Sequence, residues 1–293
     1  MFQYATGRAL SLDREAELVL DTSWFKRRAI ATTPRPYLLG QFPHLCGRLA
    51  GKHELRAAHV LAPNIGTSLS QFVKQRLDAT AHYTGLTRVA LEPTVPAKTT
   101  QIRQHPHLFL DGYWQDELYF QRWQEQICEA FTFPALASDY KRCIAEHIKT
   151  SPNAVALHVR RGDYVQGERQ LGTAAPRYYQ KALALIDDKL ECSDSNAPTI
   201  FVFSDDSEWI NQHFELGGRP FTAVRSQPDE SPLDDMQLMA LCSHHIIANS
   251  TFSWWGAWLA APDGIVCAPD PWFAGTAVGS ASPCPARWNR VVG

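Results

Sequence analysis

The sequence predicts an α/β protein whose C-terminal half forms a parallel, Rossmann-like sheet. Short apolar runs in that half end abruptly in polar clusters, and stretches with helical periodicity follow them. Strands that alternate with helices are typical of parallel sheets, which bind ligands beyond the carboxyl ends of their strands. The 293 residues suffice for one large domain or for two of about 150 residues each.

The elements of the C-terminal half follow from composition and spacing. Strands are expected where β-branched and apolar residues cluster, at residues 154–159, 200–203, 245–248 and 265–268. Helices are expected where helical patterns lie between these runs, at residues 177–189, 234–242 and 254–261.

The N-terminal half has a weaker periodicity. Helices are expected over residues 1–14 and 117–131, joined by irregular connections. A boundary is expected near residues 145–152, where helical sequence gives way to Ser-Pro-Asn. The predicted domains are therefore residues 1–150, mostly helical, and residues 151–293.

Composition argues against several partners and locations. The 28 Lys and Arg against 30 Asp and Glu leave a net charge of -2, and no long basic run is present, which argues against a nucleic-acid partner. The seven cysteines are odd in number and scattered, without a CxxC pair, as expected in a reducing compartment. The charged first twenty residues exclude a signal peptide, and no segment approaches roughly 18 uncharged apolar residues. A cytoplasmic chain without a transmembrane segment is therefore expected.

Common catalytic signatures are missing. The sequence contains no GxGxxG, GxSxG or HExxH motif. The P-loop-like stretch at residues 47–52 is one residue short, and His53 replaces the Ser or Thr that would hold magnesium. The Asp-x-Asp pattern that holds manganese in one large class of sugar-nucleotide enzymes is also missing. We therefore expect no metal and no cofactor.

An arginine pair follows directly on the first predicted strand, in HVRRGDY at residues 158–164. Arginine suits phosphate because its planar fork gives two parallel hydrogen bonds and keeps its charge. In an extended chain His158 and Arg160 share one face while Arg161 points away, so Arg160 is the favoured phosphate ligand. The alternative is that the arginines pair with Asp163 and neighbouring acids as a surface network.

A helix start follows the third predicted strand, where ANSTFS at residues 248–253 runs into a tryptophan-rich helix. Free N–H groups and the helix dipole at such a start favour an anion, and a diphosphate would fit. The plainer alternative is helix capping, with Trp254, Trp255 and Trp258 buried as core.

A carboxylate pair ends the second predicted strand, in FSDD at residues 203–206. Asp205 and Asp206 could accept hydrogen bonds from the N1–H and amino group of guanine. They could equally cap the helix that starts near Ser207. The residue types alone do not decide between these two roles.

These three clusters together define a pocket for a purine nucleotide diphosphate. HVRRGDY, FSDD and ANSTFSWWGAWL resemble the motifs of bacterial α1,2-fucosyltransferases. MFQYA at residues 1–5, GYWQ at residues 112–115 and PWF at residues 271–273 resemble further segments of that family. The resemblance therefore spans nearly the whole chain.

The resemblance implies a GT-B type glycosyltransferase with two Rossmann-like domains. The C-terminal domain would bind GDP-fucose, and the N-terminal domain would help to shape the acceptor site. The implied reaction is inverting, metal-independent transfer of fucose from GDP-β-L-fucose to the 2-hydroxyl of an acceptor, usually a terminal galactose. The implied setting is surface-polysaccharide assembly, in which the chain would associate peripherally with the inner face of the cytoplasmic membrane.

The family's donor contacts correspond here to nine residues of the three motifs, namely His158, Arg160, Arg161, Asp205, Asp206, Asn249, Ser250, Thr251 and Ser253. Candidates on the acceptor side are Tyr113, Trp114 and Gln115.

Inversion requires a base for the acceptor hydroxyl and positive groups for the leaving diphosphate. Asp163 is the first candidate for the base and His158 the second. The alternative for Asp163 is a carboxylate that only orients Arg160. Arg160, with Arg161 and the helix start after Ala248, would stabilise the diphosphate charge.

One departure from the family concerns the start of the chain. Family members begin with a short strand and a Gly-Asn-Gln turn before MFQYA, whereas this sequence starts at that methionine. We therefore expect Met1 to be an internal methionine or the chain to be truncated.

Two other functions stay open. One is a related GDP-sugar transferase with a different linkage or acceptor. The other is a nucleotide-sugar or glycan binding module, which would bind GDP without transfer.

Overall fold

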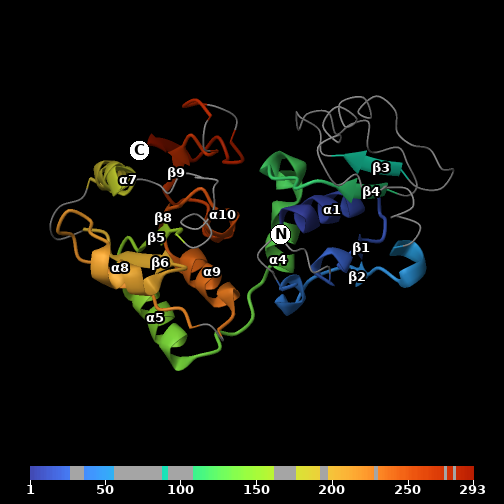
Figure 1. The fold of residues 1–293 in the computed structure, drawn as a ribbon, viewed down its shortest axis with the longest axis horizontal. Helices are drawn as coiled ribbons and strands as arrows, with labels where there is room; N and C mark the ends of the chain where they lie inside the picture. Colours follow the sequence, from blue (N-terminus) through green and yellow to red (C-terminus); the bar gives the residue numbers. More distant parts are fainter. Residues whose placement is uncertain are drawn as a thin grey trace. The chain divides into compact units, whose positions relative to one another are not determined.

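The computed structural model describes most of the chain (Figure 1), namely residues 1–26, 36–55, 88–91, 108–161, 176–191, 197–227, 230–273, 276–279 and 282–293. The chain divides into two compact units, Met1–Pro134 and Ala135–Gly293. This division precedes the expected boundary after residue 150. The reason is the helix α5 (Asp139–Thr150), whose Ile144 and Ile148 lie in the same apolar core as Leu238.

Unit 2 contains a six-stranded sheet in the order β10-β9-β8-β5-β6-β7, and all of its pairings are parallel. Its strands are β5 (Val155–Val159), β6 (Ile200–Ser204), β7 (Thr222–Ala223), β8 (His244–Ile246), β9 (Val266–Asp270) and β10 (Asn289–Val292). The parallel sheet and its four predicted strands are confirmed, whereas β7 and β10 were not predicted.

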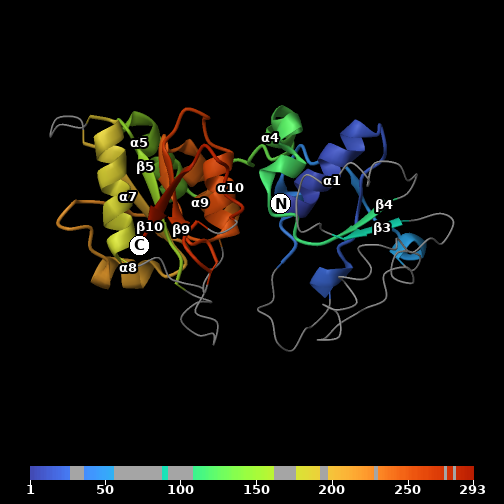
Figure 2. The same ribbon diagram turned by 90° about the horizontal axis from the view of Figure 1, so that it is seen from above.

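The sheet of unit 2 is covered on both faces. Its helices besides α5 are α7 (Pro176–Lys189), α8 (Ser207–His213), α9 (Pro232–Leu241) and α10 (Thr251–Trp258). Alternate residues of β5 enter opposite cores: Leu157 packs in the core that contains α7, and Ala156 in the core that contains α5 and α9. Figure 2 shows α7 and α9 on opposite sides of the strands. Burial on both faces explains why β5 and β6 are continuous apolar runs instead of alternating ones.

Unit 1 contains short parallel ladders and helices. β1 (Val19–Leu20) pairs with β2 (Arg48–Leu49), and β3 (Arg88–Leu91) pairs with β4 (Leu108–Asp111). The helices among its described residues are α1 (Phe2–Asp13), α4 (Gln124–Ala130) and the 3₁₀ turns η1 (Ser23–Lys26), η2 (Leu39–Gln41), η4 (Glu117–Tyr119) and η5 (Gln121–Trp123). α1 confirms the predicted first helix.

The single helix predicted over residues 117–131 is wrong, because η4 and η5 precede α4. Phe120 separates the two turns with φ -139°, and its side chain is fully buried. Asp116 caps η4 by accepting a hydrogen bond from Leu118 N. Burial of Phe120 therefore fixes a non-helical backbone in a stretch whose apolar spacing suggests a helix.

The core of unit 1 is aromatic. Phe131 lies 5.3 Å from Tyr4 and 5.1 Å from Phe42 between ring centres. At the end of α1, Asp13 accepts hydrogen bonds from Arg122 and from the indole N–H of Trp123. In the part of the chain that the structure describes, no helix combines the length and apolarity needed to cross a membrane.

Candidate active site

Two motifs meet where β5 and β6 end. The parallel register pairs His158 with Phe203 and Val159 with Ser204. The residues that follow, the arginine pair and the acid pair, therefore leave the sheet side by side at its carboxyl edge. This is the edge at which parallel sheets bind ligands.

Arg160 and Asp205 form an ion pair at that edge. The Arg160 Nη1 lies 2.9 Å from Asp205 Oδ2, and both side chains are 23% exposed. The arginines thus pair with acids, as the network alternative expected, but the described partners are the two aspartates that follow β6. Asp163 lies outside the described residues. The ion pair is therefore partly exposed at the carboxyl edge of the sheet.

Arg161 is held by three contacts. Its Nε donates to Asp206 Oδ2 at 3.3 Å, and its backbone N–H donates to Asp205 Oδ1 at 2.9 Å. The guanidinium carbon lies 3.6 Å from the ring centre of Trp209, a cation–π contact. These contacts direct the Arg161 side chain toward α8.

Asp206 caps α8, because its Oδ1 accepts a hydrogen bond from Trp209 N at 3.1 Å. The capping alternative is therefore realised for Asp206, whereas Asp205 is used by the arginines. Trp209 was not predicted from the sequence as part of the site. The signal that could have found it is its position three residues after a capping aspartate, which directs an aromatic ring back toward the strand end.

His158 is buried, with 2% of its surface exposed. Its ring lies 5.8 Å from Phe252 at the start of α10, and its backbone carbonyl accepts a hydrogen bond from Tyr179 Oη. Burial lowers the pKa of His158 to about 4, although the nearby Asp205 carboxylate raises it. The imidazole is therefore neutral at pH 7 and is a weak base.

The start of α10 is the third part of the edge. Ser250 caps the helix by accepting from Phe252 N at 3.3 Å, and Thr251 is the first helical residue. The buried Ser253 hydroxyl donates to the carbonyls of Ala248 and Ser250. Asn249 Nδ2 donates to Trp272 O at 3.4 Å, which joins this turn to the PWF segment after β9. The helix starts three residues earlier than predicted because Ser250 supplies the cap.

The tryptophans of α10 are core residues. Trp254 is fully buried and its indole N–H donates to Pro283 O, while Trp255 and Trp258 are 2% exposed. Their rings pack together, with Trp254 and Trp258 stacked at 6.0 Å. They hold the helix start in place instead of contacting a ligand.

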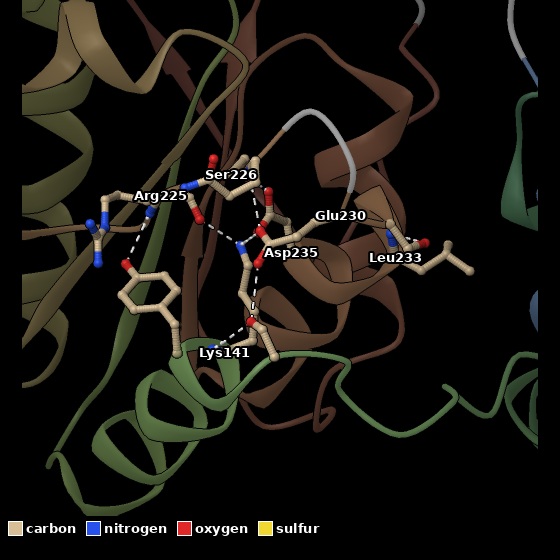
Figure 3. Close-up of polar contacts among 10 residues, drawn as sticks. Lys141, Arg225, Ser226, Glu230, Leu233 and Asp235 are labelled. Carbon is tan, nitrogen blue, oxygen red and sulfur yellow. Dashed lines mark hydrogen bonds and ion pairs between the residues drawn. The ribbon is translucent and has the colours of Figure 1, made fainter.

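A buried ion cluster fixes the segment after β7, which leaves the sheet beside β6 (Figure 3). The Lys141 side chain, 1% exposed, donates to Asp235 and to the carbonyl of Arg225 and lies 3.5 Å from Glu230. Asp235 also accepts from Ser226. One lysine of α5 thus connects the segment after β7 to the first turn of α9. Lys141 was not predicted from the sequence, because a lysine within a helical stretch is usually exposed.

The three acceptor candidates lie in unit 1, directly after β4. Tyr113 is 74% exposed, whereas Trp114 is fully buried with its ring 5.1 Å from Tyr119. Gln115 is half-buried. Trp114 is therefore a core residue in this structure, and its burial argues against its choice as an acceptor-side residue.

The carboxyl edge of unit 2 combines cationic groups, a helix start and partly exposed carboxylates. Guanidinium groups and helix N–H groups stabilise a diphosphate leaving group, and a carboxylate can recognise a purine edge. Among the described residues no three His, Cys, Asp or Glu gather to hold a metal ion. This edge can therefore bind a nucleotide diphosphate through side chains of the motifs.

Comparison with known proteins identifies the class and then the family. The fold resembles the solved structure of a mutant of FUT1 from Arabidopsis thaliana in complex with GDP, with a TM-score of 0.50 over 93% of this chain and 68% of that chain. At 11% identity this likeness shows the fold, an α/β fold of the GT-B type. The family model Glycosyl transferase family 11 matches residues 92–288. The chain belongs to this glycosyltransferase family.

Its relatives include bacterial and animal enzymes. The chain is 32% identical to an Alpha-1,2-colitosyltransferase of Escherichia coli, over 99% of this chain and 94% of the relative. It is 31% identical to the O-antigen biosynthesis glycosyltransferase WbnK of Escherichia coli, over 94% and 91%. It is 26% identical to the human Galactoside alpha-(1,2)-fucosyltransferase 1, over 56% and 46%. The predicted relationship to α1,2-fucosyltransferases is thereby confirmed.

Proposed function

We propose that this glycosyltransferase transfers L-fucose from GDP-β-L-fucose to the 2-hydroxyl of a terminal galactose, with inversion and without a metal. The observation that carries the proposal is the pairing of Arg160 with Asp205 at the carboxyl edge. The two groups lie 2.9 Å apart and are both partly exposed. A guanosine diphosphate offers each of them a partner, phosphate for the guanidinium and a purine edge for the carboxylate.

The positive groups would act on the leaving diphosphate. As the bond from the sugar to the diphosphate breaks, negative charge grows on the β-phosphate. Arg160 and the N–H groups at the start of α10 would stabilise that charge in the transition state. Arg161, which stacks on Trp209, would add its charge at longer range.

The base for the acceptor hydroxyl is proposed to be Asp163. His158, the second candidate, is weakened by its burial, because a pKa of about 4 makes the imidazole a poor proton acceptor at pH 7. An Asp163→Asn variant with near-normal turnover would exclude Asp163 as the base. The proposed role of Arg160 at the diphosphate would be unaffected.

Fucose transfer is the direct test. The protein is incubated with GDP-fucose and lactose, N-acetyllactosamine or galactosyl-β1,3-N-acetylgalactosamine, with EDTA present throughout. We expect a product whose fucose is α-linked to the galactose 2-hydroxyl, as read by NMR. Transfer that requires added Mn²⁺ would overturn metal independence, and a product with another linkage would overturn the regiochemistry.

Colitosyl transfer is the second candidate. The observation that favours it is the 32% identity, over 99% of this chain, to an Alpha-1,2-colitosyltransferase of Escherichia coli. Colitose is fucose without its 3-hydroxyl, so the two donors differ by one polar group. Parallel measurement of kcat/KM with GDP-fucose and GDP-colitose decides between them. A site that hydrogen-bonds the 3-hydroxyl rejects the deoxy sugar strongly, whereas an apolar pocket accepts it.

A further inference from the structure

Tyr113 is the most exposed large apolar side chain among the described residues, with 74% of its surface open. It lies two residues after Asp111, the last residue of β4. Tyr113 therefore lies at the carboxyl end of the parallel ladder of β3 and β4. In α/β proteins, ligands bind at the carboxyl ends of parallel strands.

The backbone that carries Tyr113 is fixed on both sides. Before it, the Gly112 carbonyl accepts a hydrogen bond of 2.7 Å from Gln3 Nε2 of α1. After it, the Trp114 side chain is fully buried against Tyr119. The backbone on both sides of Tyr113 is thus fixed, by a hydrogen bond at Gly112 and by the buried indole of Trp114.

The turn also has an unusual conformation. Gly112 has φ 151° and Trp114 has φ 56°, in a region that side chains other than glycine rarely adopt. A bulky residue stays there only when its surroundings over-determine it, and such positions concentrate at ligand sites. Burial of the Trp114 ring offsets the energetic cost of its positive φ. With Trp114 directed into the core, the neighbouring Tyr113 points away from it.

The surroundings of Tyr113 fit a small polar ligand better than a protein surface. Asp111 is exposed, and Gln115 and Asp116 are half-buried, so the ring has polar neighbours in sequence. Protein interfaces need a contiguous apolar area, whereas a sugar needs one apolar face and several polar groups. A tyrosine side chain combines an apolar ring face with a polar hydroxyl group.

We propose that Tyr113 is the platform of the acceptor subsite, on which the apolar face of a terminal hexopyranose stacks. The inference rests on the proposed function and deepens it. Because the backbone at Tyr113 is fixed before the acceptor arrives, only the side chain loses freedom on binding, which favours affinity.

The test measures acceptor and donor steps separately. Tyr113→Ala and Tyr113→Phe are compared with the unchanged protein for the KM of lactose, the affinity for GDP and the slow hydrolysis of GDP-fucose without acceptor. We expect the alanine variant to raise the KM of lactose about tenfold, while GDP affinity and hydrolysis stay within about twofold. The phenylalanine variant, which keeps the ring, should stay within about threefold of the unchanged KM.

Leu118→Ala is the matched control, because Leu118 is 55% exposed in the same segment. It should leave the KM of lactose unchanged. An unchanged KM in Tyr113→Ala would overturn the inference alone. A protein that transfers no sugar and hydrolyses no GDP-fucose would overturn the proposed function, and the inference with it.

Discussion

Arg161 stacks on Trp209, with its guanidinium carbon 3.6 Å from the centre of the ring. Asp206 completes the contact from both sides, because it accepts from Arg161 Nε and from Trp209 N. The end of β5, the end of β6 and the start of α8 are thereby joined by one carboxylate and one indole. Arg160, in contrast, pairs with the partly exposed Asp205.

Removal of the Trp209 ring should loosen Arg161 without unfolding the protein. A cation–π contact of this kind contributes about 0.5–2 kcal/mol, so Trp209→Ala should weaken GDP binding by about 2- to 30-fold. Trp209→Phe keeps an aromatic face and should recover most of the affinity. Isothermal titration with GDP measures both variants. Equal GDP affinity of Trp209→Ala and the unchanged protein would show that Arg161 needs no such support.

Arg160 should dominate the chemical step. Loss of a donor that stabilises transition-state charge costs on the order of 10²-fold in rate, so Arg160→Ala should lower kcat by about that factor. Arg160→Lys keeps the charge but loses the planar fork. Its kcat should therefore lie between that of the unchanged protein and that of Arg160→Ala. Arg219→Ala is the control, because Arg219 is an arginine of similar exposure paired with Asp187. A similar loss of kcat in Arg160→Ala and in Arg219→Ala would argue that Arg160 does not stabilise the transition-state charge.

Lys141 should be essential for stability. Its removal leaves Asp235 and Glu230 without their cation, and breaking a buried pair costs about 3–5 kcal/mol. Urea unfolding should show that the free energy of unfolding of Lys141→Met is lower than that of the unchanged protein by this amount. Lys149→Met, which breaks an exposed pair with Glu146, should lose less than about 1 kcal/mol.

A double variant separates charge from packing in this cluster. If the loss in Lys141→Met comes from uncompensated carboxylates, the added change Asp235→Asn should restore part of the stability. A double variant less stable than Lys141→Met would mean that the cluster acts through hydrogen bonds to Ser226 instead of charge.

Stability should fall on mild acidification. Burial lowers the pKa of His158 and of His245 to about 4, from an ordinary value of 6.5. The unfolded chain therefore binds more protons than the folded chain between those values. The free energy of unfolding is unaffected by these groups above about pH 6.5 and decreases as pH falls from there toward 4, by about 3 kcal/mol for each group.

Urea midpoints at pH 7, 6, 5 and 4.5 measure this decrease. His245→Gln removes one of the two groups and keeps a side chain that can donate to Met239 O, the partner of His245 Nε2. Its stability should depend less steeply on pH over the same interval. An identical slope would show that His245 contributes no proton uptake on unfolding.

The sheet of unit 2 was predictable because its strands are buried on both faces, which makes them apolar runs with sharp ends. β10 was missed because only Val291 of its four residues is buried, so it has no apolar run. β7 is only two residues long. In unit 1, the strands are short, and the backbone after Asp116 follows the burial of Tyr119 and Phe120 instead of helical periodicity.

The site was predictable in composition but not in connections. The strand ends identified Arg160, Asp205 and Ser250 as neighbours along one edge, because parallel strands place their carboxyl ends together. The partners Trp209 and Lys141 depend on how α8, α5 and α9 pack on the sheet. No local pattern encodes that packing. Tyr113 is exposed and Trp114 is buried. The sequence alone does not reveal this difference between two adjacent aromatic residues.

The in-register pairing of β5 with β6 limits how this sequence can change in length. His158 lies opposite Phe203 and Val159 opposite Ser204, so one residue inserted within either strand would shift which arginine meets which aspartate. An insertion between α7 and β6 leaves that pairing untouched. Length variation among related chains should therefore collect between the two motifs and be excluded from the strands that carry them.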